Sequence, residues 1–525
     1  MADAQRTHRV VVVGAGIAGL TSALLLAARG LDVTLVEKAA APGGKMRRVL
    51  VDGAPIDAGP TVFTMRWVFD QIFAAAGAKV EDHLKLQPLG VLARHAWRGH
   101  EPRLDLFADI RRSAEAIGEF SGPQEAQRFL GFCRQARQLY DHLEGPYIRS
   151  ERPTLGSMVG DLGPRGLMAL MQIGPFSNLW RSLSRHFRDP RLQQLFARYA
   201  TYCGASPWMA PATLMLVAQV ELDGVWAVEG GMHAVAQAFA ALAEARGVKL
   251  RFGCACEQVL VRDGRAVGVR LADGEQISAD SVVFNGDVNA LAQGLLGDPA
   301  RRATAAVAPA RRSLSALTWL VNARTSGFPL VRHNVFFDED YASEFDDIFR
   351  QRRLPRRGTV YVCAQDRTDE GTGSDAPERL LCLVNAPADG DRRPFDVSET
   401  EPCEQRSLAL MRECGLSIEW SPQTHRLVTP ADFERLFPAT GGALYGPATH
   451  GWMSSFHRAS STSRLPGLYL AGGSVHPGPG VPMAAMSGRL AAETLMAHLD
   501  STSRSRRVVI SGGMSTRSAT TGGMA

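Results

Sequence analysis

The residues that point most directly to chemistry are three glycines and an acid near the N-terminus. Gly14, Gly16 and Gly19 form a Gly-x-Gly-x-x-Gly pattern directly after a run of valines, and Glu37 follows at the end of the next apolar run. In this pattern the glycines permit a tight turn, a close pyrophosphate and a helix packed tightly on a strand. A carboxylate in the position of Glu37 accepts hydrogen bonds from ribose hydroxyls and repels a 2′-phosphate. The unit predicts a dinucleotide site, and the alternative is an ordinary glycine-rich turn.

Two further glycine turns follow this unit in an order that suits a ligand. Segment 43–47 reads Gly-Gly-Lys-Met-Arg, so backbone N–H groups and cations could contact phosphates or a flavin. Segment 59–61 reads Gly-Pro-Thr, where the backbone could lie close to a ligand. Each is weak evidence alone, with a surface turn as the alternative. Their position behind Gly19 makes the pair informative.

A third glycine turn lies near the end of the chain. A strand-like run ends at Gly472 and Gly473, and segment 476–482 leads from there into an apolar helix pattern. The N-terminus of such a helix offers the positive end of its dipole, which suits a group that gains negative charge on reduction. An early glycine unit with a late strand, turn and helix is the layout of a flavin-binding fold.

Three polar residues are candidates for proton transfer. His476 lies where the chain should pass the reacting part of a flavin, and the alternative is a loop histidine bonded to the backbone. Glu229 precedes a glycine pair, and the alternative is a cap for the helix that follows. Asp287 follows Asn285-Gly286 and is expected to stabilise a turn. His476 and Glu229 are therefore the predicted catalytic residues.

The sequence contains no Ser-His-Asp set, no paired carboxylates and no cluster with metal-ligand spacing, so no metal is predicted. Among the eight cysteines only Cys254 and Cys256 are close in sequence. Without further Cys or His at ligand spacing, they are expected to be reduced and to serve as small apolar residues.

Composition restricts the class of partner. The 525 residues carry a net charge of +5, with the positive charges scattered and not interleaved with aromatic residues, so no nucleic acid partner is expected. The fold begins at Arg9 without a signal-peptide pattern, and no apolar run is long enough to span a membrane. These features predict a cytoplasmic protein, with peripheral membrane contact as an option.

One helical region could provide that contact. Residues 165–200 contain a cluster of apolar side chains followed by Arg181, Arg185 and Arg188. Such a segment could enter a bilayer and meet lipid phosphates. The alternative, favoured by the pattern alone, is a core helix.

The elements that must position these residues alternate between strand and helix. Strand 10–13, helix 20–28 and strand 33–36 form the first unit, and strands return at 248–252, 256–262, 266–271, 276–278 and 281–284. Asp263-Gly264 and Asp273-Gly274 predict hairpin turns. Residues 110–222 are expected to be mostly helical, with helices at 123–143, 166–173, 190–199 and 209–225.

A second sheet is expected outside the first unit. Its strands are predicted at 92–97, 104–107, 314–321, 334–337, 359–364 and 380–384. Helices are expected at 404–414 and 430–437, and the last strand is followed by a helix over 483–499. Residues 501–525 are rich in Ser, Thr, Arg and Gly, which predicts a disordered tail.

Together these segments resemble the carotenoid desaturase family, the relatives of bacterial phytoene desaturase in the flavin amine oxidase-like superfamily. The resemblance spans roughly residues 8–500 and is carried by the Gly14–Glu37 unit, Gly43-Gly44-Lys45, Asp57-Ala58-Gly59-Pro60-Thr61, Glu229-Gly230-Gly231-Met232, and Leu468–Pro482. The last segment is the most specific, because family members end in a similar His-Pro-Gly-x-Gly-x-Pro sequence.

Within the family, the chain is most similar to the purple-bacterial 1-hydroxycarotenoid 3,4-desaturases. Segments 202–207, 333–337 and 383–387 support this similarity. Segment 474–480 reads Ser-Val-His-Pro-Gly-Pro-Gly, whereas phytoene desaturases tend to have Thr before the His and Ala between the glycines. This departure from the phytoene desaturase pattern favours the later pathway step, the 3,4-desaturation.

The resemblance implies an α/β fold with a Rossmann-like FAD-binding domain assembled from discontinuous segments 1–90, 225–300 and 460–500. An inserted α+β domain of mixed sheet and helices, 91–224 and 301–459, would face the substrate and the membrane. The predicted FAD contacts are Gly14, Ala15, Gly16, Ile17, Ala18, Gly19, Glu37, Lys38, Gly43, Gly44, Lys45, Met46, Arg47, Gly59, Pro60, Thr61, Val259, Gly472, Gly473 and Pro482.

The implied activity is FAD-dependent 3,4-desaturation of acyclic 1-hydroxycarotenoids in carotenoid biosynthesis. The implied partners are a lipid-soluble C40 carotenoid, quinone or oxygen as electron acceptor, and the inner photosynthetic membrane. An allylic C–H beside a polyene is weakened by delocalisation, so hydride loss to flavin needs no strong activating group. Open alternatives are phytoene desaturase, carotenoid isomerase, flavin amine oxidase and a non-catalytic carotenoid-binding flavoprotein.

Overall fold

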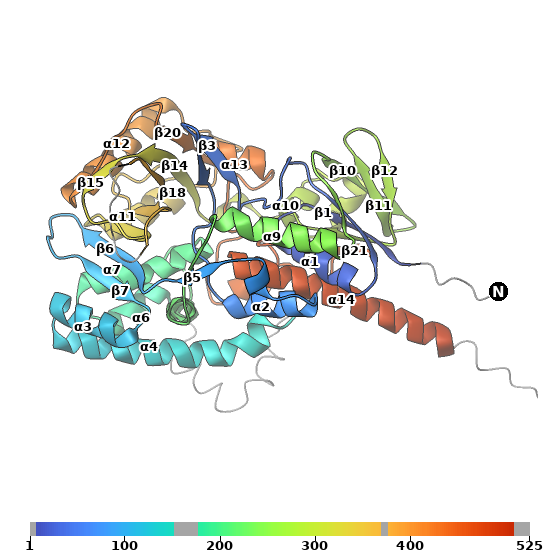
Figure 1. Cartoon of the computed structure of the whole chain (residues 1–525), viewed down its shortest axis with the longest axis horizontal. Coiled ribbons are helices and arrows are strands. Elements are labelled where there is room, and N and C mark those ends of the chain that lie inside the picture. Colours follow the sequence, from blue (N-terminus) through green and yellow to red (C-terminus); the bar gives the residue numbers. More distant parts are fainter. Residues whose placement is uncertain (1–6, 152–176, 369–375, 509–525) are drawn as a thin grey trace, which may run out of the picture.

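Two sheets organise the computed structural model, which describes residues 7–151, 177–368 and 376–508 (Figure 1). The first sheet lies with β1 and β21 on the right of the view, and the second lies with β14 and β18 at the upper left. Helices α9, α1 and α14 run across the right half, and α3, α4, α6 and α7 lie below the second sheet. The architecture is therefore mixed α/β with a parallel sheet and a mixed sheet.

The first sheet is entirely parallel and has the order β21-β13-β1-β2-β9. Apolar runs such as Val10–Val13 form strands that can be buried on both faces, as parallel sheets require. Helix α1 packs against α9 and α14 over this sheet. The bounds are β1 Arg9–Val13, β2 Asp32–Val36, β9 Lys249–Arg251, β13 Ser281–Phe284, β21 Leu468–Leu470, α1 Ile17–Ala28, α9 Met232–Ala245 and α14 Val481–Val508.

A small antiparallel sheet, β10-β11-β12, lies beside the parallel sheet. Asp263 and Gly264 both have positive φ, 48° and 73°, which is the backbone form that an Asp-Gly hairpin turn needs. This confirms the predicted hairpin. Two-stranded pairs join β3 to β4, β5 to β8 and β15 to β19. The bounds are β10 Cys256–Arg262, β11 Arg265–Leu271, β12 Gln276–Ser278, β3 Arg48–Val51, β4 Ala54–Asp57, β5 Leu86–Pro88, β8 Trp226–Val228, β15 Thr325–Gly327 and β19 Leu416–Ile418.

The second sheet has seven strands in the order β20-β14-β18-β17-β16-β6-β7. Neighbouring strands are antiparallel except for the pair β16 and β6, which is parallel. Alternate residues of each strand therefore share one face. The bounds are β6 Val91–Trp97, β7 Leu104–Phe107, β14 Ser315–Ala323, β16 His333–Phe337, β17 Val360–Ala364, β18 Glu378–Ala386 and β20 His425–Val428.

Helices cover this sheet and share a core with it. Leu139 of α4, Leu183 of α6 and Leu195 of α7 pack in one buried cluster with Val335 and Phe337 of β16. The bounds are α3 Ile110–Ser121, α4 Pro123–Leu143, α6 Leu179–His186, α7 Pro190–Ala197 and α8 Leu216–Leu222, with α2 Arg66–Ala75, α10 Val288–Ala292, α11 Tyr341–Phe349, α12 Val397–Glu413 and α13 Pro430–Leu436 elsewhere.

Two of the expected boundaries differ from the structure, and one expected helix cannot be compared with it. The helix expected over 209–225 is a 3-10 turn, Ala212–Met215, followed by α8, because Pro211 cannot donate a helical hydrogen bond and Gly224 turns the chain at φ 127°. The expected helix 166–173 lies outside the described residues. The disordered tail was expected to begin at residue 501, but helix α14 continues to Val508. Extending an existing helix needs no new nucleus, so composition alone misplaced its end.

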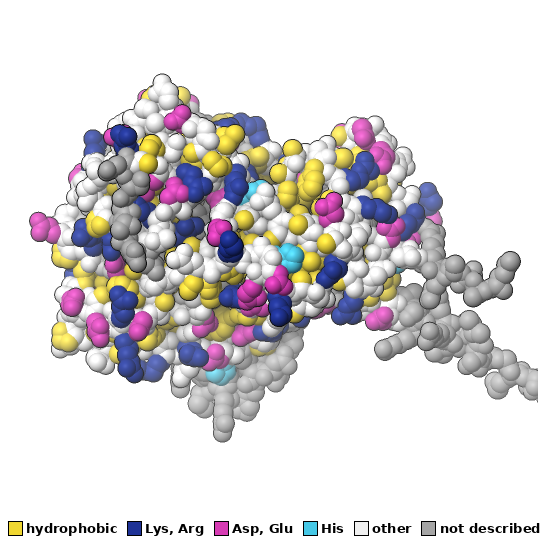
Figure 2. Space-filling model, in the orientation of Figure 1, with side chains coloured by type: hydrophobic (Ala, Val, Ile, Leu, Met, Phe, Trp, Pro, Cys, Tyr) yellow, Lys and Arg dark blue, Asp and Glu magenta, His cyan; other side chains and the backbone are white. Residues whose placement is uncertain are grey.

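The visible surface carries both signs of charge. Lys and Arg alternate with Asp and Glu over the face in Figure 2, as the scattered charges of the sequence predicted. In the part of the chain that the structure describes, no helix combines the length and apolar character needed to cross a bilayer.

Candidate functional site

A large cavity lies between the two sheets, lined by residues of both. It has a volume of about 1020 Å³, at the upper end of the range for ligand pockets. Val13, Glu37 and Phe284 line it from the carboxyl ends of parallel strands, where open α/β sheets bind ligands. Tyr361 and Leu383 line it from the second sheet. One continuous space therefore borders both sheets.

The first glycine unit forms a close-fitting cradle at one end of this cavity. Gly14 has φ 99°, and a Cβ on it would lie 2.8 Å from the carbonyl oxygen of Asn285. A Cβ on Gly19 would overlap the carbonyl oxygen of Gly14. Gly16 is the N-cap of α1, and no side chain of the described residues caps the first turn of this helix. The backbone N–H groups at the start of α1 are therefore available to a ligand, as in other anion-binding helix termini.

Glu37 lies at the end of β2, with its side chain on the cavity wall. The residue is buried, and its two carboxylate oxygens accept hydrogen bonds from the backbone N–H groups of Ala15 at 2.7 Å and Ala39 at 2.8 Å. These bonds fix the carboxylate beside the glycine turn. The remaining lone pairs can accept hydrogen bonds from ribose hydroxyls.

Three cations line the cavity near the glycine turns. Arg47 has two buried guanidinium nitrogens, Nε and Nη2, without a hydrogen-bond partner in the described structure. Lys45 donates from Nζ to the carbonyl oxygen of Leu444 at 2.6 Å, and burial lowers the pKa of its ammonium group. Burial also lowers the pKa of Arg458. Buried donors without partners are unfavourable, so this wall fits an anionic group such as a pyrophosphate.

Most of the residues predicted to contact the cofactor lie on this one wall. The cavity is lined by Gly14, Gly16, Ile17, Ala18, Glu37, Lys38, Gly43, Gly44, Lys45, Met46, Arg47, Gly59, Pro60, Thr61, Gly472, Gly473 and Pro482. Three others do not line it. Ala15 faces Glu37 through its N–H, Gly19 packs against Gly14, and Val259 is fully buried on β10, where its N–H donates to the carbonyl oxygen of Leu296.

His476 lies behind the cavity wall and does not line the cavity. It is 3% exposed, its Nε2 lies 2.9 Å from the carbonyl oxygen of Tyr147, and the two rings meet edge to face at 4.9 Å. Burial lowers the pKa of His476 to about 4. The arrangement matches the alternative of a loop histidine bonded to the backbone. Its direct effect is to hold Tyr147, which does line the cavity.

Glu229 also lies away from the main cavity. Its side chain is 68% exposed and pairs with Lys85 at 3.1 Å, beside a separate cavity of about 360 Å³. It does not cap the helix either, because Asp57 accepts the hydrogen bond from the N–H of Met232 at the start of α9. A Cβ on Gly231 would overlap that carboxylate, which explains the glycine. Geometry therefore gives Glu229 no role in proton transfer in the main cavity.

Asp287 stabilises a turn, as expected. Its side chain accepts a hydrogen bond from the N–H of Asn289 at 2.9 Å and so caps α10. It also lines the cavity, where burial raises its pKa and the charges of Lys45 and Arg458 oppose that rise.

Asn285 and Arg458, two polar residues of the wall near the glycine turns, were not among the predicted contacts. Asn285 donates from Nδ2 to the carbonyl oxygen of Gly14 at 3.1 Å and closely approaches Gly16 and Gly19. Its place after strand Ser281–Phe284, at a carboxyl end, was a usable signal. Arg458 donates to the carbonyl oxygens of Tyr445, Gly473 and Pro447 at 2.9–3.3 Å. Nothing in its local sequence marks it.

A hydrogen-bonded chain of side chains joins the glycine turn to the second sheet. Thr61 Oγ1 lies 2.7 Å from the hydroxyl oxygen of Tyr361, which lies 2.7 Å from His333 Nδ1. Burial lowers the pKa of His333 to about 3, so this histidine is neutral. Beyond this chain the wall is largely apolar, with Leu214, Leu216, Val217, Val220, Leu381 and Leu383. The site can hold a dinucleotide at one end and a long apolar molecule at the other.

Comparison with known proteins agrees with this geometry. A model of the flavin containing amine oxidoreductase family matches residues 17–496. A hydroxyneurosporene desaturase of Rubrivivax gelatinosus is 95% identical over 525 residues, which is all of both chains. A zeta-carotene-forming phytoene desaturase of Myxococcus xanthus is 33% identical over 97% of this chain and 98% of its own length.

A solved putrescine oxidase with putrescine bound shares the fold with a TM-score of 0.57 at 15% identity, covering 94% of this chain and 99% of its own. That likeness supports the architecture alone. The family model and the two curated relatives decide the classification: the chain belongs to the flavin-containing amine oxidoreductase family, in its carotenoid desaturase group.

Proposed function

We propose that this protein is an FAD-dependent desaturase that introduces a 3,4 double bond into acyclic 1-hydroxycarotenoids during carotenoid biosynthesis. The observation that carries the proposal is the single cavity with a dinucleotide cradle at one end and an apolar wall at the other. The name of the relative at 95% identity, hydroxyneurosporene desaturase, supports the substrate class. Bound FAD would supply the hydride acceptor for the CH–CH bond that becomes the double bond.

We assign residues 1–90, 225–300 and 460–500 to a Rossmann-like FAD-binding domain and residues 91–224 and 301–459 to a substrate domain. In this assignment the uncapped N–H groups after Gly16 would hold the pyrophosphate, Glu37 would hold the ribose, and Arg47 would donate to a phosphate. The turns at 59–61 and 472–473, with Pro482, would adjoin the flavin ring. The free backbone donors and the unpartnered nitrogens of Arg47 support these roles.

The remaining lining residues orient the substrate. Leu381, Leu383 and Val217 present apolar surface to a polyene, and burial of that surface favours binding by about 25 cal/mol per Å². Cation character that develops at an allylic carbon is delocalised along the polyene. The chain therefore needs no strong base, and the proton can leave to water or a weak base.

We propose quinone or oxygen as the final electron acceptor and a cytoplasmic location with peripheral contact at the inner photosynthetic membrane. The lipid-soluble substrate supports the contact. Arg181 and Arg185 are exposed on α6, whereas Leu179 and Leu183 on the same helix are buried in the core. The apolar cluster 167–176 that would enter the bilayer lies outside the described residues.

The test is turnover of a defined substrate by the flavin-loaded protein in membranes. Hydroxyneurosporene should yield a product two hydrogen atoms lighter, with a red-shifted spectrum from the longer polyene. Consumption of phytoene alone would favour the rival suggested by the Myxococcus relative, a phytoene desaturase. A product of unchanged mass would indicate an isomerase, and peroxide release from polyamines an amine oxidase. A protein purified without flavin would favour a non-catalytic carrier.

A further inference from the structure

The face of the second sheet that borders the cavity changes from apolar to polar along its strands. Leu381, Leu383 and Asn385 are alternate residues of β18, so they share a face, and all three line the cavity. Tyr361 pairs with Leu383 across to β17, and Thr359 lies just before that strand on the same wall. Tyr341, the first residue of α11, lines the cavity as well.

A buried carboxylate fixes the orientation of the polar groups on this wall. Glu344 is 1% exposed and forms no ion pair among the described residues. Its Oε1 accepts a hydrogen bond from Asn385 Nδ2 at 2.8 Å, and its Oε2 accepts from the N–H and the hydroxyl of Thr359 at 2.9 and 2.8 Å. Because the amide of Asn385 turns its NH₂ toward this acceptor, its Oδ1 points the other way. Asn385 is half-buried, and no described residue donates to Oδ1.

Tyr341 lines the same cavity and carries a hydroxyl that could donate a hydrogen bond. Its hydroxyl is buried and has no hydrogen-bond partner in the described part of the chain. Its ring is held by Phe337 at 6.2 Å and Trp208 at 5.8 Å between ring centroids, and it lies one helical turn from Glu344. A buried hydroxyl without a partner is unfavourable, and a bound acceptor would relieve that cost.

A second polar group on the cavity wall differs in this respect. The hydroxyls of Tyr199 and Tyr202 both donate to Glu221, at 2.7 and 2.5 Å, and Arg198 Nη1 donates to the Tyr202 oxygen at 3.0 Å. The two tyrosine hydroxyls and Glu221 therefore have structural partners, whereas Arg198 Nε is buried without a hydrogen-bond partner among the described residues. The acceptor on Asn385 and the donor on Tyr341 have no such structural partner in the part of the chain that the structure describes.

We propose that Tyr341 and Asn385, oriented by Glu344, form a subsite for the tertiary hydroxyl of the substrate. The proposal rests on the proposed function. An alcohol is both donor and acceptor, so it can donate to Asn385 Oδ1 and accept from the Tyr341 hydroxyl. The subsite therefore selects carotenoids that carry a hydroxyl at C1 over those that do not.

The spacing along the strands suits this role. Asn385 and Thr359 lie two residues beyond Leu383 and Tyr361, a step of about 7 Å. Tyr361 touches Thr61 of the glycine turn that we assign to the flavin ring. In a 1-hydroxycarotenoid only C2 separates the carbon that bears the hydroxyl from the C3–C4 bond. A hydroxyl held at Asn385 thus places the reacting bond on the polar part of the wall, between Asn385 and Tyr361, and leaves the polyene to extend along the apolar wall.

The test compares two substrates in the flavin-loaded enzyme: hydroxyneurosporene and the same carotenoid without the hydroxyl. The wild type should prefer the hydroxylated substrate in kcat/KM by at least about tenfold. Tyr341→Phe should reduce that preference by about tenfold through the hydroxylated substrate alone, because it removes one hydrogen bond. Asn385→Leu should do the same, and both variants should keep the wild-type flavin absorbance.

Tyr469→Phe is the matched control, since it removes a hydroxyl from a tyrosine that does not line the cavity. Its preference should equal that of the wild type. The subsite is overturned if the wild type turns over both carotenoids equally well, if Tyr341→Phe slows both equally, or if Tyr469→Phe abolishes the preference. A wild type that desaturates neither carotenoid would instead overturn the proposed function.

Discussion

The cradle and the second-sheet wall border the same cavity but are built in different ways. The cradle consists of backbone from short contiguous segments, 14–19 and 43–47, packed so closely that an added Cβ overlaps a neighbour. The wall consists of side chains from alternate strand positions, such as Tyr361, Leu383 and Asn385, contributed by separate strands. The cradle should tolerate almost no added atom. The wall should change its selectivity for substrates when one of its side chains changes.

The largest effect is expected from a side chain added to the cradle. In Gly19→Val the new Cβ would overlap the Gly14 carbonyl oxygen, so α1 must move away from β1. We expect the flavin-to-protein ratio of the purified protein to fall below about a tenth and the free energy of unfolding to fall by about 1–3 kcal/mol. Flavin absorbance and denaturant titration measure both.

Gly131→Ala is the control for that substitution. Gly131 lies inside α4, and the atom nearest to an added Cβ is the flexible end of Arg134, 3.8 Å away. Alanine there should keep the flavin and raise stability by about 0.5–1 kcal/mol. A Gly19→Val protein that retains wild-type flavin would refute the close-packed cradle.

Removal of a charge from the cradle should have a smaller effect. Arg47→Met removes the guanidinium whose Nε and Nη2 lack partners. We expect FAD to bind about tenfold more weakly, since a charged hydrogen bond to a phosphate is lost. The flavin-free protein should be no less stable, because two buried nitrogens without a hydrogen-bond partner among the described residues are unfavourable. Isothermal titration and thermal unfolding of both forms separate these effects.

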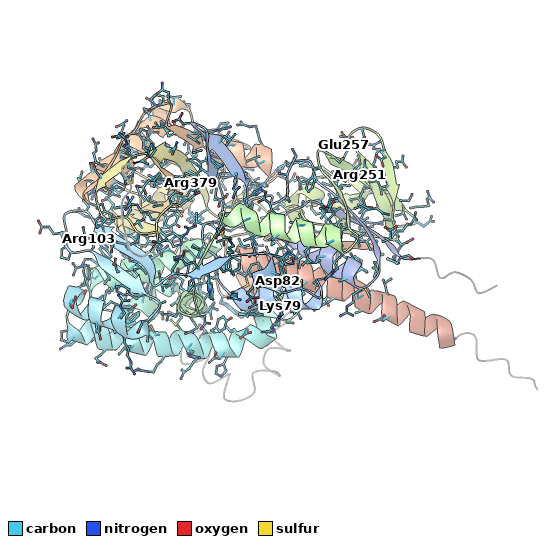
Figure 3. The ribbon with its side chains drawn as sticks, in the orientation of Figure 1. Lys79, Asp82, Arg103, Arg251, Glu257 and Arg379 are labelled. Carbon is cyan, nitrogen blue, oxygen red and sulfur yellow. The ribbon has the colours of Figure 1, made fainter. Side chains whose placement is uncertain are left out.

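Arg103→Met is the control for the loss of one arginine charge. Arg103 lies by the β6–β7 end of the molecule, at the left of Figure 3, with its guanidinium 5.4 Å from the Phe328 ring centroid, and it does not line the cavity. FAD affinity should be unchanged in this variant. Equal affinities in Arg47→Met and the wild type would show that Arg47 does not meet the cofactor.

On the wall side, loss of an ion pair should alter stability more than flavin binding. The fully buried carboxylate of Asp347 anchors α11, accepting from Arg353 Nη2 at 2.7 Å and the N–H of Arg356 at 3.0 Å. Burial alone would raise the pKa of Asp347, but these hydrogen bonds lower it overall. Asp347→Asn should reduce the free energy of unfolding by about 2 kcal/mol at pH 7 and leave the flavin content unchanged.

The pH dependence of that variant follows from the lowered pKa. The stabilisation by ionised Asp347 is fully present above the unfolded-state pKa of about 4 and is lost as the pH falls through the folded-state pKa. The difference between the wild type and Asp347→Asn should therefore narrow below about pH 4. A constant difference down to pH 2 would contradict the ion pair as its source.

The smallest effect is expected at His476, which holds the wall from behind. His476→Asn should reduce kcat/KM less than about threefold, without change in its pH profile, because only a structural hydrogen bond is lost. A proton acceptor at this position would give a loss of about 100-fold or more. The lowered pKa also implies that the wild type loses stability as the pH falls from about 6.5 towards 4, and that His476→Asn loses less.

The cradle could be predicted from sequence because its information is local. Glycines at fixed spacing after a valine run, and an acid at the end of the next strand, specify a turn, a helix and the place of a carboxylate beside them within 29 residues, 9–37. The Asp263-Gly264 turn was predictable for the same reason. These features depend on the backbone conformations of a few neighbouring residues.

The wall could not be predicted in this way because long-range pairing decides it. Asn385 acquires a role only when β18 lies beside β17 and α11 delivers Glu344 to its amide. Arg458 is identified only by the three carbonyl groups that surround it. His476 had a specific motif, but the motif could not show on which side of the wall its ring lies. The sequence therefore located the segment but could not place the His476 side chain relative to the cavity.

The order of strands in the parallel sheet also has a consequence for biosynthesis. Strand β21 pairs with β13, yet it is made only after more than a third of the chain has followed β13 from the ribosome. At bacterial elongation rates this interval lasts roughly 10 to 40 s. During it the edge of β13 is unpaired, and the residues 472–482 that close the cavity do not yet exist. A chain truncated before β21 cannot complete the cavity. We therefore expect only chains translated as far as the last helix to retain the cofactor.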